Sequence, residues 1–259
     1  MISNFVEKND ALVQRILEII PGFLTWSLIL SPVWLGLIFP EGIVYMLMFF
    51  TVYWAYLALT HSIGILLGYQ RFKKETALNW FDEVKQLDLK NLPEPERLPP
   101  TLNDLRHFVL IPVVNEDYEI LKPAFDSILE QSMPTSQMLL IYTIEEKYSE
   151  EVKQTLEKIH KEHKHKFEDI LIYVHPAGIE GEAKGVGGAN RTWGARHAVE
   201  HLIGSGKEIK NYIFSSLDAD HVLHKEYLAR LLHLYLSADK RDNRFFSTAI
   251  HLFNNNHWR

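Results

Sequence analysis

The sequence contains no cysteine, which excludes disulfide bonds and thiolate metal sites and fits a reducing compartment. It also lacks any dense run of basic residues. Its 33 acidic residues outnumber its 27 lysines and arginines, which gives a net charge of −6. A nucleic acid is therefore not expected as the main partner. The 259 residues are enough for one substantial domain and a smaller unit.

Charged side chains are almost missing from residues 21–70, where only Glu41 and His61 ionise near neutral pH. Two long apolar runs lie on either side of a polar turn expected at Pro40-Glu41-Gly42. A helix needs about 20 apolar residues to span a bilayer. The sequence thus predicts a transmembrane helical hairpin over residues 21–70. A hairpin buried in the core of a soluble protein is the alternative.

The flanks of this hairpin predict its orientation. Lys8 and Arg15 precede it, cations follow it within residues 71–74, and the turn between the two runs has none. The positive-inside rule then places both ends in the cytoplasm of a multi-pass membrane protein. Residues 1–20 carry an apolar stripe at helical spacing. We expect an amphipathic helix there, lying along the membrane surface or packed against the hairpin.

Residues 71–104 are expected to form a juxtamembrane linker, extended rather than helical where proline and charge accumulate. After this linker, apolar runs alternate with helical patterns. Strands are expected at residues 108–114, 138–144, 170–174, 212–217 and 245–250. Helices are expected at residues 120–129, 148–159, 192–202 and 227–234. This alternation predicts an α/β fold with a mostly parallel sheet and helices on both faces.

Polar side chains follow three of the predicted strands, and ligands of parallel sheets bind beyond the carboxyl ends of the strands. These residues are Asn115 and Glu116 after the first strand, Glu145 and Glu146 after the second, and Asp218 and Asp220 after the fourth. We expect them to converge on one rim of the sheet. Acidic groups gathered in this way require a cation or a cationic ligand.

Asp218 and Asp220 stand at positions i and i+2 beyond a strand, so both can face the same point. Two carboxylates suit Mg²⁺ or Mn²⁺, with water or phosphate oxygens completing the shell. Such an ion would neutralise a departing diphosphate. In the alternative, Asp220 caps the following helix and Asp218 is an ordinary loop acid. An EF-hand is excluded because its glycine and its terminal glutamate are missing.

A glycine-rich stretch, "EGEAKGVGGANRTWGARHA" (residues 180–198), is the second candidate for ligand binding. It does not satisfy the dinucleotide pattern G-x-G-x-x-G, and the chain has no P-loop. Lys184 and Arg191 either contact phosphate or are solvated loop cations. The sequence also contains two groups of closely spaced histidines. For His160, His163 and His165 we expect a solvated helix face rather than a metal site, and the sequence does not decide the role of His221 and His224.

From about Arg106 onward, the chain resembles the membrane-anchored members of glycosyltransferase family 2, which include cellulose and hyaluronan synthases. "HFVLIPVVNED" is similar to the family's first strand and its turn, and "ILKPAFDSILEQSMP" to the next helix. "IFSSLDADHVLHKEYL" resembles the strand, D-x-D motif and helix that hold the metal and the diphosphate. The resemblance implies the nucleotide-binding part of a GT-A domain over residues 105–259.

The resemblance also implies roles for individual residues. By this resemblance, the nucleotide base and ribose would be contacted by Val113, Asn115, Glu116 and either Glu145 or Glu146. The family usually has an aspartate after the second strand, where this chain has a glutamate. The G-K-x-x-N segment of the family is matched by Lys184, expected to contact phosphate, and Asn190. Asp218 and Asp220 would hold Mg²⁺ or Mn²⁺, and Asp218 would also lie at the donor.

The activity implied is inverting transfer of a sugar from a nucleotide-sugar, with a UDP-sugar as the expected donor. The acceptor would be a glycan or a lipid-linked molecule at the bilayer. The family's catalytic base and its Q-x-x-R-W motif are not found here, so the base is expected beyond Arg259. One alternative is a non-catalytic membrane-anchored subunit that binds a nucleotide-sugar or has a structural role. An NAD-linked enzyme is another.

Overall fold

The computed structural model of the protein describes residues 9–182 and 187–247. The chain divides into two units, Met1–Gln70 and Arg71–Arg259.

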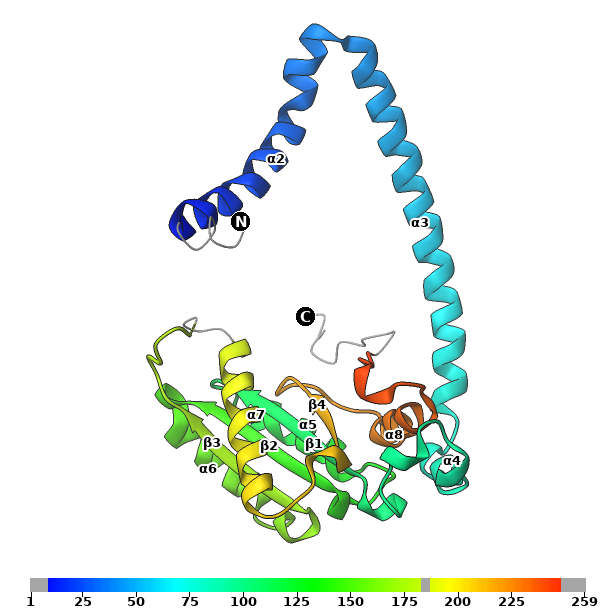
Figure 1. Ribbon diagram of the computed structural model, residues 1–259, viewed down its shortest axis with the longest axis vertical. Helices are drawn as coiled ribbons and strands as arrows, with labels where there is room; N and C mark the ends of the chain where they lie inside the picture. The colour runs from blue at the N-terminus through cyan, green and yellow to red at the C-terminus, as the bar shows by residue number, and fades with distance from the viewer. Residues whose placement is uncertain (1–8, 183–186, 248–259) are drawn as a thin grey trace. The chain divides into compact units, whose positions relative to one another are not determined.

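The first unit consists of helix α2 (Asp10–Ile38) and most of helix α3 (Pro40–Thr76) (Figure 1). The helix boundary expected near residue 20 is wrong, because α2 continues through Pro21. The turn expected at residues 40–42 is also misplaced, since the helices separate at Phe39 (φ −144°, ψ 75°). The conformation before a proline is pushed away from helical, whereas proline itself suits the first position of a helix.

Both helices are long and apolar enough to span a membrane. Ser31 is the one buried residue of α2 in the part that the structure describes, and α3 has no buried residue. A helix in the core of a soluble domain would have its apolar side chains covered by protein. The exposure of these side chains argues against a soluble-core hairpin.

Residues 71–104 are not the extended linker that the sequence suggests. They contain the end of α3, helix α4 (Trp80–Lys85) and the short 3₁₀ turns Leu89–Asn91, Pro95–Arg97 and Leu102–Asp104. The Asn79 side chain caps α4 by accepting a hydrogen bond from the backbone N–H of Asp82 (3.2 Å). Val84 and neighbouring leucines pack into the core of the second unit. The burial of these apolar side chains gives the segment a fixed fold despite its prolines.

The second unit contains a parallel sheet of four strands in the order β3-β2-β1-β4. The strands are β1 (Arg106–Val113), β2 (Met138–Glu145), β3 (Asp169–His175) and β4 (Tyr212–Ser216). The α/β class and these four strands are confirmed, with ends that differ from the predicted ones by two residues at most. Residues 245–247 of the predicted fifth strand are not in a strand, and 248–250 lie outside the described residues.

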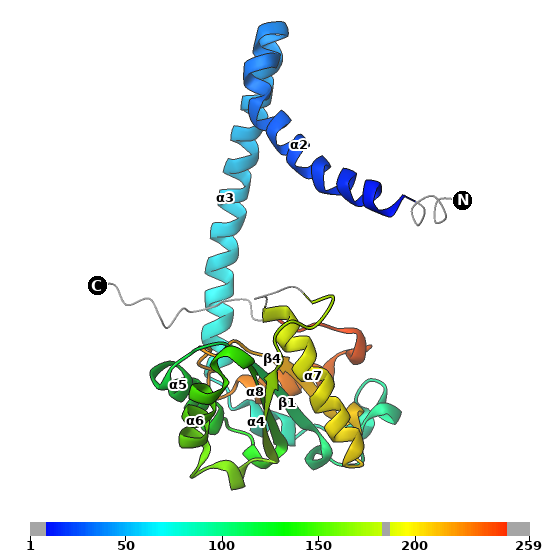
Figure 2. The same ribbon diagram turned by 90° about the vertical axis from the view of Figure 1, so that its left-hand side faces the viewer.

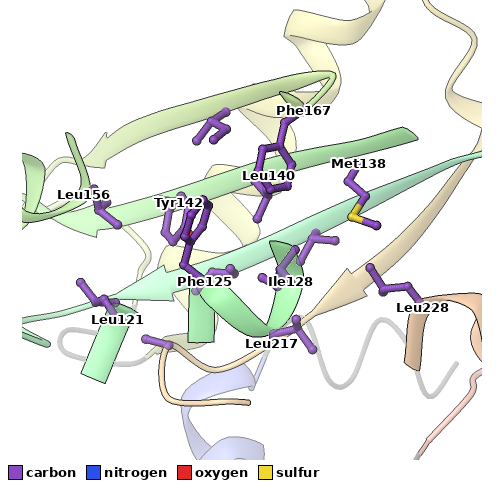
Figure 3. Close-up of a cluster of buried hydrophobic side chains, with 14 of the residues drawn as sticks. Leu121, Phe125, Ile128, Met138, Leu140, Tyr142, Leu156, Phe167, Leu217 and Leu228 are labelled. Atoms are coloured by element: carbon purple, nitrogen blue, oxygen red, sulfur yellow. The ribbon is translucent and has the colours of Figure 1, made fainter. Parts of the chain in front are cut away.

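Helices cover both faces of the sheet, with three on one face and one on the other (Figure 2). They are α5 (Tyr118–Leu129), α6 (Ser149–His160) and α8 (Tyr227–Ser237) on one face, and α7 (Gly187–Gly204) on the other. The larger core lies between the sheet and the first three helices (Figure 3). There, Phe125 of α5 and Leu140 of β2 are almost completely buried. Each such side chain contributes about 1.5–3 kcal/mol to folding.

The strand order creates a topological switch point between β1 and β4. The chain leaves β1 toward β2 on one side, whereas β4 pairs with β1 on the other. Open α/β sheets bind their ligands beyond the carboxyl ends of the strands at such a point. The residues that follow β1 and β4 are therefore the first place to look for a site.

Candidate functional site

The end of β4 directs the two aspartates of the D-x-D motif toward the same side. Beyond the strand, the Leu217 N–H donates to the Leu110 carbonyl of β1 (2.9 Å), so the pairing continues for one more residue. Leu217 and Ala219 point into the core and are buried. Asp218 between them is exposed, and Asp220, in the turn that follows, is half-buried.

Asp218, Asp220 and His221 each offer a ligand atom, and these atoms lie within 4.8 Å of one another. No other such group of acids and histidines occurs within residues 9–182 and 187–247. His221 Nε2 lies 3.4 Å from Asp218 Oδ2, while its Nδ1 accepts the backbone N–H of Asp218 (3.2 Å). With Nδ1 as acceptor, the ring proton is on Nε2 and faces the carboxylate. His221 thus orients Asp218, a role the sequence leaves undecided.

These residues fit a divalent cation. Two carboxylates at this separation supply the hard oxygen ligands that Mg²⁺ and Mn²⁺ prefer. The alternative in which Asp220 caps the next helix is wrong, because α8 begins at Tyr227 and its N-cap residue is Glu226. Asp218 contacts both His221 and Arg191.

The loop after the motif is fastened to the end of α5. Leu223 N–H donates to Ser127 Oγ (2.9 Å), and Leu228 N–H donates to Gln131 Oε1 (3.0 Å). Gln131 Nε2 in turn donates to the His224 carbonyl (2.9 Å). Ser127 lies in the last turn of α5, and Gln131 follows just after the helix ends at Leu129. The sequence shows this S-x-x-x-Q spacing, but only the structure shows that it closes the D-x-D loop.

A second set of contacts holds the start of α8 to residues 75–80. Glu226 is buried, and one of its oxygens accepts from Trp80 N–H (2.9 Å) and Ser132 Oγ (2.8 Å). One helical turn later, Arg230 makes two hydrogen bonds to Glu75 (2.7 and 3.0 Å). Its guanidinium lies 3.8 Å from the centre of the Trp80 ring. The loop that carries the aspartates is therefore supported at its far end by buried polar contacts.

Helix α7 lies directly on β2, close to the same rim. A Cβ at Gly194 would overlap Thr143 Cγ2, so only glycine allows this approach. Asn190 is fully buried and donates from Nδ2 to the Thr143 carbonyl (3.0 Å). In this structure Asn190 holds α7 on the sheet, and its predicted part in donor binding stays a prediction. Lys184, the other residue of that segment, lies outside the described residues.

Arg191 of α7 brings a cation to the D-x-D motif. Its Nη2 donates to Asp218 Oδ1. The residue is part of a helix, not of the solvated loop considered as an alternative. Its Nε atom is buried without a hydrogen-bond partner among the residues described. No sequence pattern pointed to this pair, whose members come from α7 and from the end of β4.

The two glutamates after β2 contact the segment after β3 instead of the aspartates. His175, at the end of β3, lies between Glu182 (2.8 Å from Nε2) and Glu145 (3.5 Å from Nδ1). Glu146 accepts the Ala177 N–H (2.8 Å). The strand ends do lie on one rim of the parallel sheet, and there the two glutamates have partners at the end of β3 and just after it. Strand β1 separates β2 from β4, which places their ends about 10 Å apart.

The turn after β1 borders β4 in the sheet. Val113, the last residue of β1, is fully buried, so only its backbone is available to a ligand. Glu116 accepts the Val114 N–H (2.7 Å) and folds the turn back on itself. Asn115 between them is exposed. Of the predicted nucleotide ligands, this turn is the nearest in the strand order to Asp218 and Asp220.

The histidines of residues 160–165 do not form the solvated face expected from the sequence. His160 is buried, with its ring centre 4.8 Å from that of Phe125 and 4.9 Å from that of Tyr142. Burial, together with the charge of Lys164, lowers the pKa of His160 to about 4. His160 therefore belongs to the core, whereas His165 is exposed.

A comparison with known protein families and one with curated proteins both give no match.

Proposed function

We propose that this protein is a metal-dependent, membrane-anchored glycosyltransferase with a GT-A-type domain. It would transfer a sugar from a UDP-sugar to a glycan or lipid-linked acceptor, with inversion at the anomeric carbon. The observation that carries the proposal is the position of Asp218 and Asp220. They lie at a topological switch point, face the same side and are close enough to share one divalent ion.

The neighbouring strand end supports a nucleotide as the rest of the ligand. Adjacent strands are about 4.8 Å apart, so the turn after β1 lies next to the motif after β4. Asn115 there is exposed and offers both a donor and an acceptor to a base or a ribose. In this arrangement, the nucleoside lies over β1 and the diphosphate over β4.

The chain's own residues would hold and orient the charged part of the donor. Asp218 and Asp220 are the proposed ligands of Mg²⁺ or Mn²⁺. A bound ion would stabilise the negative charge that develops on the leaving diphosphate. His221 fixes the orientation of Asp218, and Gln131 keeps the loop closed behind it. We assign no general base among the described residues.

Two features support a position at a membrane. Helices α2 and α3 are long and apolar enough to cross a bilayer, and basic residues flank them. By the positive-inside rule, both ends of the pair, and with them the α/β unit, would lie in the cytoplasm. A cytoplasmic donor site beside the bilayer suits an acceptor that is lipid-linked or exported.

Calorimetric titration of UDP into the full chain in detergent tests the proposed donor site. We expect binding with Mn²⁺ and at least about ten-fold weaker binding with EDTA, since a charge-assisted contact is lost. Asp218→Asn should reproduce the effect of EDTA. The control Asp239→Asn changes an exposed acid after α8 and should leave binding unchanged. An affinity for UDP that is the same with Mn²⁺ and with EDTA would overturn the proposal.

The same preparation separates the proposed enzyme from its alternatives. Slow hydrolysis of a UDP-sugar in the presence of Mn²⁺, lost in Asp218→Asn, is expected for a transferase. Metal-dependent UDP binding without hydrolysis or transfer of any UDP-sugar would favour the non-catalytic subunit. An NAD-linked enzyme would instead bind NADH and tolerate Asp218→Asn.

A further inference from the structure

We propose that Arg191 is a built-in counter-cation for the D-x-D motif. Without a divalent ion, its guanidinium neutralises Asp218. When the ion binds, the side chain leaves the carboxylate and contacts the donor diphosphate. This inference rests on the proposed function, because it assumes that the ion and the diphosphate bind at Asp218 and Asp220.

The first reason is electrostatic. Carboxylate atoms of Asp218 and Asp220 lie within 4.8 Å of each other, a distance at which two negative charges repel. The guanidinium of Arg191 hydrogen bonds to Asp218 Oδ1 and brings a positive charge to this carboxylate. Arg191 and a divalent ion therefore compete for the same carboxylate.

The second reason is that the side chain can move while its backbone cannot. Asn190, the residue before Arg191, is hydrogen-bonded to Thr143 of β2. One helical turn later, Gly194 packs closely against the same threonine. The pair itself is partly open to solvent, with side-chain exposures of 39% for Arg191 and 52% for Asp218. Ion pairs exposed to this degree are weak. A small change of side-chain rotamer is thus enough to release Asp218.

The third reason is spare hydrogen-bonding capacity. A guanidinium has five N–H donors and pairs well with phosphate oxygens. Nη2 of Arg191 is used by Asp218, while Nε is buried with no partner in the described part of the chain. Arg191 also lies in the second turn of an 18-residue helix, whose N-terminal end favours negative charge. A diphosphate held beside Asp218 would meet these donors.

The proposal predicts opposite effects on two ligands when Arg191 is removed. Mn²⁺ alone should bind about five-fold more tightly to Arg191→Ala, because the weak competing ion pair is gone. UDP in the presence of Mn²⁺ should bind about ten-fold more weakly, because a charged hydrogen bond to phosphate is lost. A residue that only stabilises the fold would weaken both.

The experiment is a pair of calorimetric titrations on the full chain in detergent, with Mn²⁺ alone and then with UDP at saturating Mn²⁺. Arg191→Lys keeps the positive charge but loses the paired N–H donors of the guanidinium. The affinity for Mn²⁺ should therefore stay near the wild-type value, while the affinity for UDP falls. Arg196→Ala is the matched control, since Arg196 is exposed on the same helix. Both of its affinities should be unchanged. Thermal unfolding of each variant confirms that it is folded.

The outcomes separate this inference from the proposed function. If wild type binds no Mn²⁺ with or without UDP, both fail. If wild type binds Mn²⁺ through Asp218 but Arg191→Ala binds it equally or more weakly, the proposed function stands and the counter-cation is rejected. If Mn²⁺ binding tightens but UDP binding does not weaken, the transfer of Arg191 to the diphosphate is wrong.

Discussion

His107 of β1 is a buried residue that makes the stability of the domain sensitive to acid. Its side chain is fully buried, and neither ring nitrogen has a partner among the residues described. Burial lowers the pKa of His107 to about 3. The unfolded chain takes up this proton near pH 6.5. Above pH 6.5 the histidine is neutral in both states and adds no pH dependence to stability, whereas stability falls as the pH drops from 6.5 toward 3.

His107→Leu should make the protein less sensitive to acid. Each such histidine lowers the free energy of unfolding by about 1.4 kcal/mol per pH unit below 6.5. The variant should therefore keep a higher melting temperature than wild type at pH 5, with the difference growing between pH 6.5 and 4. Circular dichroism melting curves measure this, and His165→Leu, at an exposed position, is the control. Parallel pH profiles for wild type and His107→Leu would contradict the assignment.

At the scale of single residues, the sequence predicted what depends on local geometry. The i, i+2 spacing of Asp218 and Asp220 lets both carboxylates face one point, and in the structure a ligand atom of each lies within 4.8 Å of the other. The contact of Arg191 with Asp218 could not be predicted. Helix α7 lies between β3 and β4 in the chain, and its packing on the sheet brings Arg191 to Asp218. This packing is a property of the tertiary fold.

At the scale of elements, the approach of α7 to β2 depends on Gly194. Gly194→Ala should lower the free energy of unfolding by about 1–3 kcal/mol, the usual cost of overpacking a protein core. Any larger side chain would push the helix off Thr143. Gly204→Ala, in the same helix, meets nothing within 4 Å and is the matched control. Chemical denaturation compares the two variants with wild type.

A second substitution makes this prediction specific. Thr143→Ala removes the Cγ2 atom that the new Cβ would meet. The double variant Gly194→Ala, Thr143→Ala should therefore lose less stability than the sum of the two single changes. Additive losses would mean that the helix and strand do not approach as closely as described.

Among the elements, the four strands were predictable because each contains a short run of apolar residues, although only β1 and β2 are buried along almost their whole length. The fold of residues 71–104 was not. Its apolar side chains are scattered among prolines and charges, and they gain burial only against the core of the α/β unit. The start of α7 at Gly187 was also missed, because glycine is a poor helix former.

At the scale of the whole molecule, the absence of cysteine makes the proposed topology straightforward to test. Single cysteines introduced as Glu41→Cys and Glu208→Cys report on the helix connection and on the α/β unit. We expect a membrane-impermeant maleimide to label Glu41→Cys in intact cells, and Glu208→Cys only after lysis. The reverse pattern would contradict the cytoplasmic orientation, and labelling of both in intact cells would contradict a two-span hairpin.

The central claim is that Asp218 and Asp220 hold a divalent ion against a nucleotide diphosphate. Anomalous diffraction at the manganese edge, from crystals of the full chain grown with Mn²⁺ and UDP, tests it most directly. We predict a manganese peak about 2 Å from a carboxylate oxygen of each aspartate and in contact with the diphosphate. A UDP molecule bound elsewhere, or bound there with no manganese between it and the aspartates, would contradict the account.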